Sequence, residues 1–406
     1  MKLVLISALA FSLCADAFAQ RPTTFTEVLT QAIKTHPALS AKRADARAAS
    51  ADKEAADWSM YPSPSLEAST ASTGIESPPG AVLRIDQPLW TGGRITAAID
   101  SAKSQLDVAT VAVHEARWNL TLQVISSYFE ALRHKARMSH AQQSVQEHEK
   151  LLAMIGRRVE QEVSSKVDQR FAESRLFQAN NERSQIAQSL KSALTQLAQL
   201  GGQPLQDVVW DGTQEVTVPA SLESAQDAAL KVSPTLRKLQ YEIELANAVI
   251  DVKRSAYKPQ LLLRLERQAG ANLVADSRAM LVLQAQPGAG LAAFNGVDSA
   301  VAKRESATLA LESAQRDVMQ RVTLDWDDYV NSRARLRDAM QASDISSDVF
   351  DSYARQYVIG RKSWIDVLNA VRETVQAQYT VDDARAQTAS AAMRLRLECG
   401  LLLAND

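Results

Sequence analysis

The residue types that most often perform catalysis are present in this chain of 406 residues, but without the spacing that catalysis needs. None of the five histidines belongs to an H-E-x-x-H motif or to a pair four residues apart, as a helical zinc site requires. G-x-S-x-G, a phosphate-binding loop and G-x-G-x-x-G are also absent. The acidic run at 325–328 lacks EF-hand spacing, which favours a solvated helix face over a calcium site. We therefore expect no enzyme activity, no cofactor and no metal.

Two carboxylates stand out because each closes a Ser-x-x-Asp motif. Asp168 follows Ser165 and Asp366 follows Ser363, and each motif comes just after an expected break between two long helices. An Asp at this distance from a Ser caps the start of a helix and favours its dipole. Capping is one of two interpretations of these residues; the other rests on the resemblance described below.

The two motifs belong to a larger internal repeat. Residues 32–39, AIKTHPAL, match residues 229–236, ALKVSPTL, and Gln87-Pro88 matches Gln286-Pro287 further along. Such self-similarity indicates two copies of one structural unit. We assign the first copy to 20–221 and the second to 222–406.

Composition and the first residues indicate a folded, exported protein. The chain is 46% hydrophobic, which excludes disorder, and its net charge of -2 provides no field to hold nucleic acid. Residues 1–19 form a basic, then apolar segment that ends in Ala17-Phe18-Ala19, as in a cleaved secretory signal peptide. Lipidation of Cys14 is the alternative, but Leu13 occupies a position that requires a small residue.

Each copy contains long helical tracts. We expect short helices at 25–35 and 222–232, second helices at about 38–58 and 235–256, and helical hairpins at about 94–200 and 297–398. A heptad pattern on the first long helix, from about Arg94 to Glu162, predicts supercoiling over roughly 100 Å. Its two rows are Ile99, Leu106, Val113 and Leu120, and Ala102, Ala109 and Ala116.

Between these helices lie segments with a period of two, at about 62–90 and 260–287. Apolar residues such as Leu83 and Leu263 alternate with ions such as Arg84 and Arg264, which indicates strands between lipid and water. We expect two hairpins, with loops at 74–80 and 270–278. Four aromatic residues fall at the same ends of these strands, as in an interfacial belt: Trp58, Tyr61, Trp90 and Tyr257. The alternative is an edge hairpin of a soluble α+β domain, with these aromatics as core anchors.

Four strands are too few to close a membrane barrel, for which about eight is the minimum. If the strands span a membrane, the chain must oligomerise. We therefore predict a mainly α fold with a small β part, in which three copies build a 12-stranded outer-membrane β-barrel continued by a periplasmic α-barrel.

Several motifs together resemble the TolC family of outer-membrane exit ducts. They are the twofold repeat, Thr35-His36-Pro37-Ala38-Leu39, the run from Gln87 to Arg94 (QPLWTGGR), and the run from Tyr357 to Leu368 (YVIGRKSWIDVL). The resemblance implies a homotrimer in outer-membrane lipid that works with a periplasmic adaptor and an inner-membrane transporter, either ABC-type or proton-driven. The form Gln286-Pro287-Gly288-Ala289-Gly290 resembles the branch that serves type I secretion of adhesins.

The resemblance also implies roles for residues near the helical breaks. Asp366 matches an aspartate that rings the closed aperture and favours cations, as three carboxylates near one axis would. A second aspartate of the family falls on Asn369, so this ring is less charged. Tyr357 and Lys362 match residues that latch the aperture shut through the equivalent of Asp168.

These observations predict a passive outer-membrane channel of a tripartite efflux pump or a type I secretion system, which extends into the periplasm. A soluble periplasmic coiled-coil adaptor or scaffold is the alternative. The duplicated strand pattern separates the two, because an adaptor has no need of two lipid-facing stripes.

Overall fold

The computed structural model describes residues 22–69, 80–210, 217–270, 273–285 and 292–402. The predicted signal peptide and most of the 74–80 loop therefore lie outside the described residues. The first half of the chain contains α1 (Phe25–Thr35), α2 (Pro37–Trp58), β1 (Ser63–Ser69), β2 (Gly80–Trp90), α3 (Arg94–Glu160) and α4 (Lys166–Gly201). The second half repeats this order with α5 (Leu222–Val232), α6 (Pro234–Ser255), β3 (Gln260–Gly270), β4 (Leu273–Gln284), α7 (Ala292–Val358) and α8 (Trp364–Glu398).

Corresponding helices of the two halves have matching lengths. The helices α1 and α5 have 11 residues each, α2 and α6 have 22, and α3 and α7 have 67. Left-handed glycines follow α4 and α8 at Gly202 (φ 71°) and Gly400 (φ 74°). The internal match in sequence is thus a repeat in structure.

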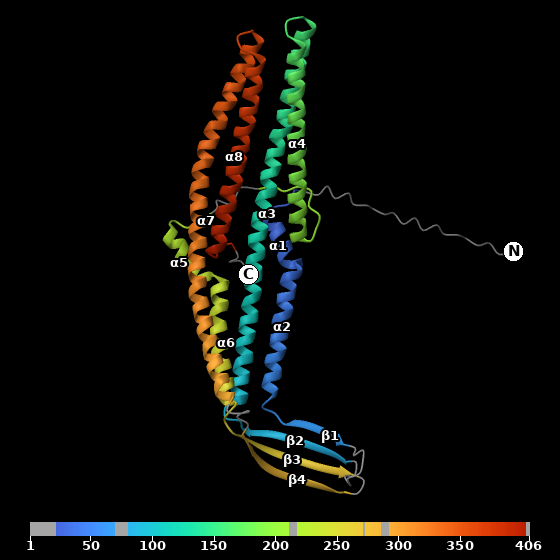
Figure 1. Ribbon diagram of the computed structural model, residues 1–406, viewed down its shortest axis with the longest axis vertical. Helices are drawn as coiled ribbons and strands as arrows, with labels where there is room; N and C mark the ends of the chain where they lie inside the picture. Colours follow the sequence, from blue (N-terminus) through green and yellow to red (C-terminus); the bar gives the residue numbers. More distant parts are fainter. Residues whose placement is uncertain (1–21, 70–79, 211–216, 271–272, 286–291, 403–406) are drawn as a thin grey trace, which may run out of the picture.

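The two long helices run almost the whole length of an elongated molecule. Figure 1 shows α3 beside α2 and α6 in one half and beside α4 in the other, while the four strands lie at the end opposite the two hairpin turns. Along the predicted heptad, Leu120 is buried but Ile99, Leu106 and Val113 are only half-buried in a single chain. Nearby residues Val108 and Val111 are buried instead, because α3 has more than one neighbour in this half.

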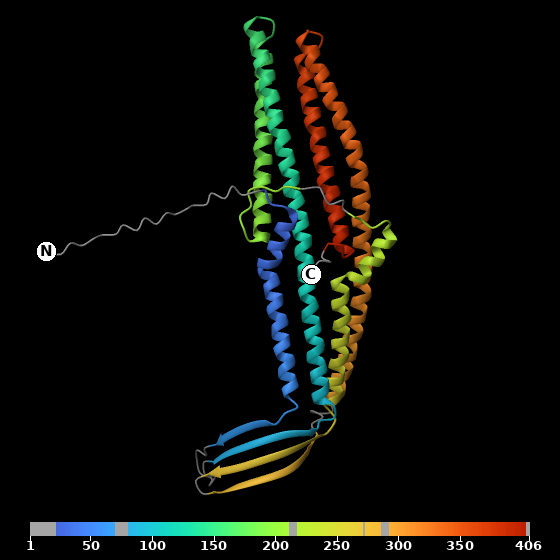
Figure 2. The same cartoon turned by 180° about the vertical axis from the view of Figure 1, so that it is seen from behind.

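The strands form one antiparallel sheet in the order β1-β2-β3-β4 (Figures 1 and 2). Residues opposite each other across a ladder share a face of the sheet. One face aligns Pro64 with Ile85 and Leu265, and Leu263 with Leu281. The other aligns ions, including Asp86 with Arg264 and Arg84 with Glu266. The predicted alternation is therefore confirmed, although Arg267 lies opposite Leu83 on the apolar face.

Two predicted boundaries were wrong. The segment 270–278 is mostly strand, because β4 begins at Leu273 and pairs Asp276 with Gln268 and Arg278 with Glu266. This strand was missed because consecutive polar residues in the segment interrupt the alternation of apolar and polar side chains. The second long helix begins at Ala292 rather than near 297, and Gly296 continues it without a break.

A pair of glycines makes the sharp join between β2 and α3. Gly92 has φ +61°, and a Cβ atom there would lie 2.6 Å from Cβ of Lys258. Gly92 thus packs against Lys258, in the segment between α6 and β3 of the second repeat. A side chain at this position would not fit, so the contact requires glycine. Among the described residues, none of the helices is both long and apolar enough to cross a membrane.

Candidate functional site at the hairpin turns

The two helical hairpins turn at the same end of the molecule (Figure 1). At the first turn, the backbone N–H of Ser165 donates to Oδ2 of Asp168 (3.0 Å), and the Asp168 N–H donates to Oγ of Ser165 (3.2 Å). Ser363 and Asp366 form the same reciprocal pair at the second turn, at 3.2 Å for both bonds. Both aspartates therefore cap helices, as the Ser-x-x-Asp spacing predicts.

Asp366 has a further bond that Asp168 lacks. The hydroxyl of Ser363 donates to Oδ2 of Asp366 at 2.9 Å. The side-chain and backbone donors of Ser363, followed by the charge of Lys362, lower the pKa of Asp366. Its carboxylate is thus charged at neutral pH, and the side chain of Asn369 is exposed one turn further along α8.

The three predicted latch residues do not meet within one chain. Tyr357 is 5% exposed, and its ring lies 5.1 Å from the guanidinium carbon of Arg158. Nζ of Lys362 lies 4.1 Å from the ring centre of Tyr353. No hydrogen bond or ion pair joins Asp168 to Tyr357 or Lys362 in the part of the chain that the structure describes.

Two contacts that the sequence did not reveal join the hairpins near their turns. Arg158 of α3 lies over Tyr357 of α7, and Phe171 of α4 meets Trp364 of α8 edge-to-face at 5.5 Å. Arg175 covers Phe171 from within α4 at 4.8 Å. Trp364 is the first residue of α8, directly after Ser363, so an aromatic residue at a helix start was the only available signal. The two hairpins therefore contact each other near their turns through one cation–π contact and one aromatic pair.

The predicted aromatic belt lies at the join between helices and sheet. Trp58 ends α2 and Trp90 ends β2, and both are more than half exposed. The rings of Trp58 and Tyr61 lie 5.1 Å apart, as do those of Tyr257 and Phe294. Phe294 is a further aromatic residue at this join, and it was not predicted because α7 begins earlier than expected.

The acidic run on α7 is not a wholly solvated face. Asp325 is 8% exposed and accepts from Nε of Arg394 on α8 at 2.7 Å, while Asp328 accepts from Nη2 at 3.1 Å. The solvated-face interpretation was wrong for Asp325, because Arg394, 69 residues further along the chain, supplies its partner. Among the described residues, no group of three or more His, Cys, Asp or Glu side chains is arranged to hold a metal.

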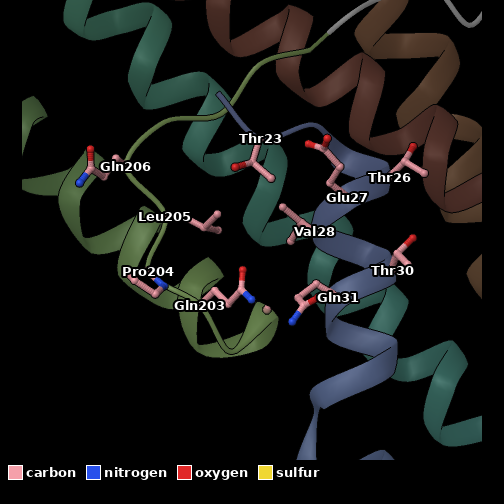
Figure 3. Close-up of a pocket in the computed structure, with 11 residues that line it drawn as sticks. Thr23, Thr26, Glu27, Val28, Thr30, Gln31, Gln203, Pro204, Leu205 and Gln206 are labelled. Atoms are coloured by element: carbon pink, nitrogen blue, oxygen red, sulfur yellow. The ribbon is translucent and has the colours of Figure 1, made fainter. Parts of the chain in front are cut away.

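Cys399 is the free cysteine of the described residues, and it is buried. Burial, followed by the charge of Glu398, raises the pKa of the Cys399 thiol to about 11, so it stays protonated. A cavity of about 520 Å³ beside α1 is lined by threonine and glutamine side chains, such as Thr30, Gln31 and Gln203, and by apolar residues such as Val28 and Leu205 (Figure 3). Its carboxylate, Glu27, caps α1 through the Thr24 N–H at 2.8 Å.

The architecture joins a four-stranded sheet end-on to two helical hairpins of nearly equal length. The family model for outer membrane efflux proteins matches residues 28–203 and 225–401, and the chain belongs to this family. The two matched stretches correspond to the two structural repeats.

Solved channel structures share the fold. The outer membrane protein VceC from Vibrio cholerae is 16% identical with a TM-score of 0.78, over 93% of this chain and 96% of that one. The CmeC channel from Campylobacter jejuni is 14% identical with a TM-score of 0.81, over 93% and 85%. The open-state MtrE channel from Neisseria gonorrhoeae is 16% identical with a TM-score of 0.77, over 93% and 88%. No curated protein sequence matches the chain.

Proposed function

We propose that three copies of this chain form a passive exit duct across the outer membrane and into the periplasm. The sheet carries the proposal. Its strands β1 and β4 each have one edge without a partner in the described chain, and one face is apolar, with Leu66 72% and Leu281 67% exposed. Unpaired strand edges and bare leucines both require a cover. When three sheets join edge to edge in lipid, each free strand edge gains a partner strand and the exposed leucines contact lipid. The resulting barrel has 12 strands.

The duct serves a tripartite system, with a periplasmic adaptor and an inner-membrane transporter at the turn end. The transporter is ABC-type or proton-driven, and type I secretion of adhesins is the narrower form of the proposal. Membership of the outer membrane efflux family supports an efflux role and disfavours the soluble adaptor. A cleaved signal peptide at 1–19 and repeats at 20–221 and 222–406 complete the proposal.

Membrane fractionation tests this function directly. The protein should be recovered with the outer membrane, and chemical cross-linking should trap a species of three chains. Recovery as a soluble periplasmic monomer would contradict the proposal. Purified protein in planar bilayers should also conduct ions.

At the turn end, three copies of Asp366 form the ring that favours cations. The ring is supported by the charged state of Asp366 and by its place beside the turn. Asn369, one turn along, adds an uncharged ring. Since a fixed carboxylate ring attracts cations by simple electrostatics, the mouth discriminates by charge.

Asp366→Asn should lower the cation preference of the open channel, because it removes three charges from the ring. The measurement is the reversal potential in a KCl gradient across a planar bilayer. Glu27→Gln is the matched control, since it also removes one carboxylate per chain and disturbs the equivalent capping box of α1, far from the hairpin turns (Figure 1). A change of the same size in both variants would show that the cap, rather than the ring, sets the selectivity.

Closure of the mouth depends on contacts between hairpins. Arg158 over Tyr357 and Phe171 against Trp364 act within each chain. Lys362 and Asp168 act as the latch between neighbouring copies. An aromatic pair contributes about 0.5–1.5 kcal/mol and a partly exposed cation–π contact about 0.5–1 kcal/mol. Such contacts are weak enough for an adaptor to release them.

Arg158→Ala combined with Trp364→Ala should raise the fraction of time that the channel is open, because both contacts within the chain are lost. Single-channel recording would measure this fraction. Phe177→Ala is the control: this ring is 72% exposed on α4, and no ring contact of it occurs in the described chain. Equal opening in the control and the double variant would exclude the two contacts as a latch.

A further inference from the structure

The polar face of the sheet carries charges that are almost completely paired. Cross-strand register places seven charged side chains on this face. Arg264 donates two hydrogen bonds to the carboxylate of Asp86, from Nε (2.7 Å) and from Nη2 (2.9 Å). Arg84 lies 3.7 Å from Glu266, and Arg278 lies 2.8 Å from Asp276. These six residues cancel one another in pairs.

Glu67 is the seventh charged residue of this face, and it stands apart. The residue opposite Glu67 on β2 is Val82, which in turn faces Gln268 on β3. Its cross-strand neighbours are therefore uncharged, and no ion pair of Glu67 occurs among the residues that the structure describes. Its side chain is exposed. Among the described strand residues, this face carries one uncompensated negative charge, and within one chain that charge belongs to Glu67.

We infer that Glu67 makes the membrane part of the duct prefer cations, independently of the ring at the turn end. The inference rests on the proposed trimer, in which the apolar face meets lipid and the polar face lines water. Because this face carries one uncompensated negative charge per chain, three copies place three such charges around the passage. Fixed charges that line a barrel set its selectivity, whereas self-paired charges cancel at a distance.

The size of the effect depends on salt. Fields from exposed charges decay over about 10 Å in 0.1 M salt but over about 30 Å in 0.01 M salt. For carboxylates on the order of 10 Å from the axis, we expect Glu67→Gln to lower the ratio of cation to anion permeability about twofold at 0.1 M and several-fold at 0.01 M. Glu67→Lys should shift it further in the same direction.

The test is the reversal potential of trimers in planar bilayers under a KCl gradient, at both salt concentrations. The matched control is the double variant Asp86→Asn with Arg264→Gln, which removes a whole pair from the same face and leaves the net charge unchanged. We expect a shift for Glu67→Gln, no shift for the control, and the same shift when Asp366→Asn is also present.

Failure of this inference differs from failure of the proposed function. Normal conductance with an unmoved reversal potential in Glu67→Gln would overturn the role of Glu67 and leave the duct intact. A shift in the control as large as that in Glu67→Gln would overturn it as well. Absence of any conductance from correctly inserted wild-type protein would instead contradict the duct.

Discussion

Arg394→Ala is expected to lower the free energy of unfolding by about 3–5 kcal/mol, the usual cost of removing one partner from a buried ion pair. Arg394 of α8 holds Asp325 at 2.7 Å and Asp328 at 3.1 Å on α7, and Asp325 is 8% exposed. Without the guanidinium, a carboxylate stays in a poorly solvated site with no counter-charge. Urea denaturation of the protein in detergent, followed by circular dichroism, would measure the loss.

The loss in the free energy of unfolding caused by Arg394→Ala should also depend on pH. Burial already raises the pKa of Asp325, against the opposing charge of Arg394. A carboxyl whose pKa is raised by folding contributes its stability at low pH and loses it as pH rises through that pKa. Removing Arg394 raises this pKa further, so the deficit should shrink on acidification. Arg333→Ala is the control, an exposed arginine on α7 with no ion pair among the described residues. A loss no larger than the control's would contradict the buried-pair interpretation.

Tyr128→Ala should lower the free energy of unfolding by about 3–5 kcal/mol, because it empties a fully buried site in the core around α1. The Tyr128 ring lies edge-on to Phe25 at 5.5 Å and to Phe129 at 5.8 Å. Its hydroxyl lies 2.5 Å from the carbonyl oxygen of Val209. Trp210 packs on Phe129, so tryptophan fluorescence during urea denaturation would report on this region.

Tyr128→Phe separates packing from hydrogen bonding at the same position. The ring stays and the hydroxyl is lost, so we expect a loss of only about 0.5–1.5 kcal/mol. The carbonyl oxygen of Thr23, 3.1 Å from the hydroxyl, loses the same neighbour. If the Ala and Phe variants were equally stable, the ring would contribute nothing, and the core would have to be assigned elsewhere.

Much of the fold could be predicted because its signals are local. The Pro after each short helix, the Ser-x-x-Asp caps and the repeat located most helix ends to within two residues. The β4 boundary could not be found in this way. There, Ser277 and Asp276 belong to a strand because β3 pairs with them. Backbone pairing across strands overrode a local composition that is typical of a loop.

The candidate site was predicted only in part. Asp366 and Asp168 were located by their motifs, and their capping geometry follows from a spacing of three residues. The partners of Tyr357 and Trp364 were not, because Arg158 and Phe171 belong to the other hairpin. No periodicity along one helix indicates which side chain of another helix will lie over it.

The sequence by itself determined the twofold repeat, the helix caps and the alternating faces of the strands, since each depends on residues a few positions apart. Only the tertiary structure decided which charges are paired. Arg394 meets Asp325 and Arg264 meets Asp86, whereas Glu67 forms no ion pair with the residues that the structure describes. The physical reason is that local spacing sets the conformation of a segment, whereas an ion pair needs two segments to be packed side by side. The heptad of α3 is a further example: its spacing predicts the helix, but the packing of neighbouring helices decides which of its residues are buried.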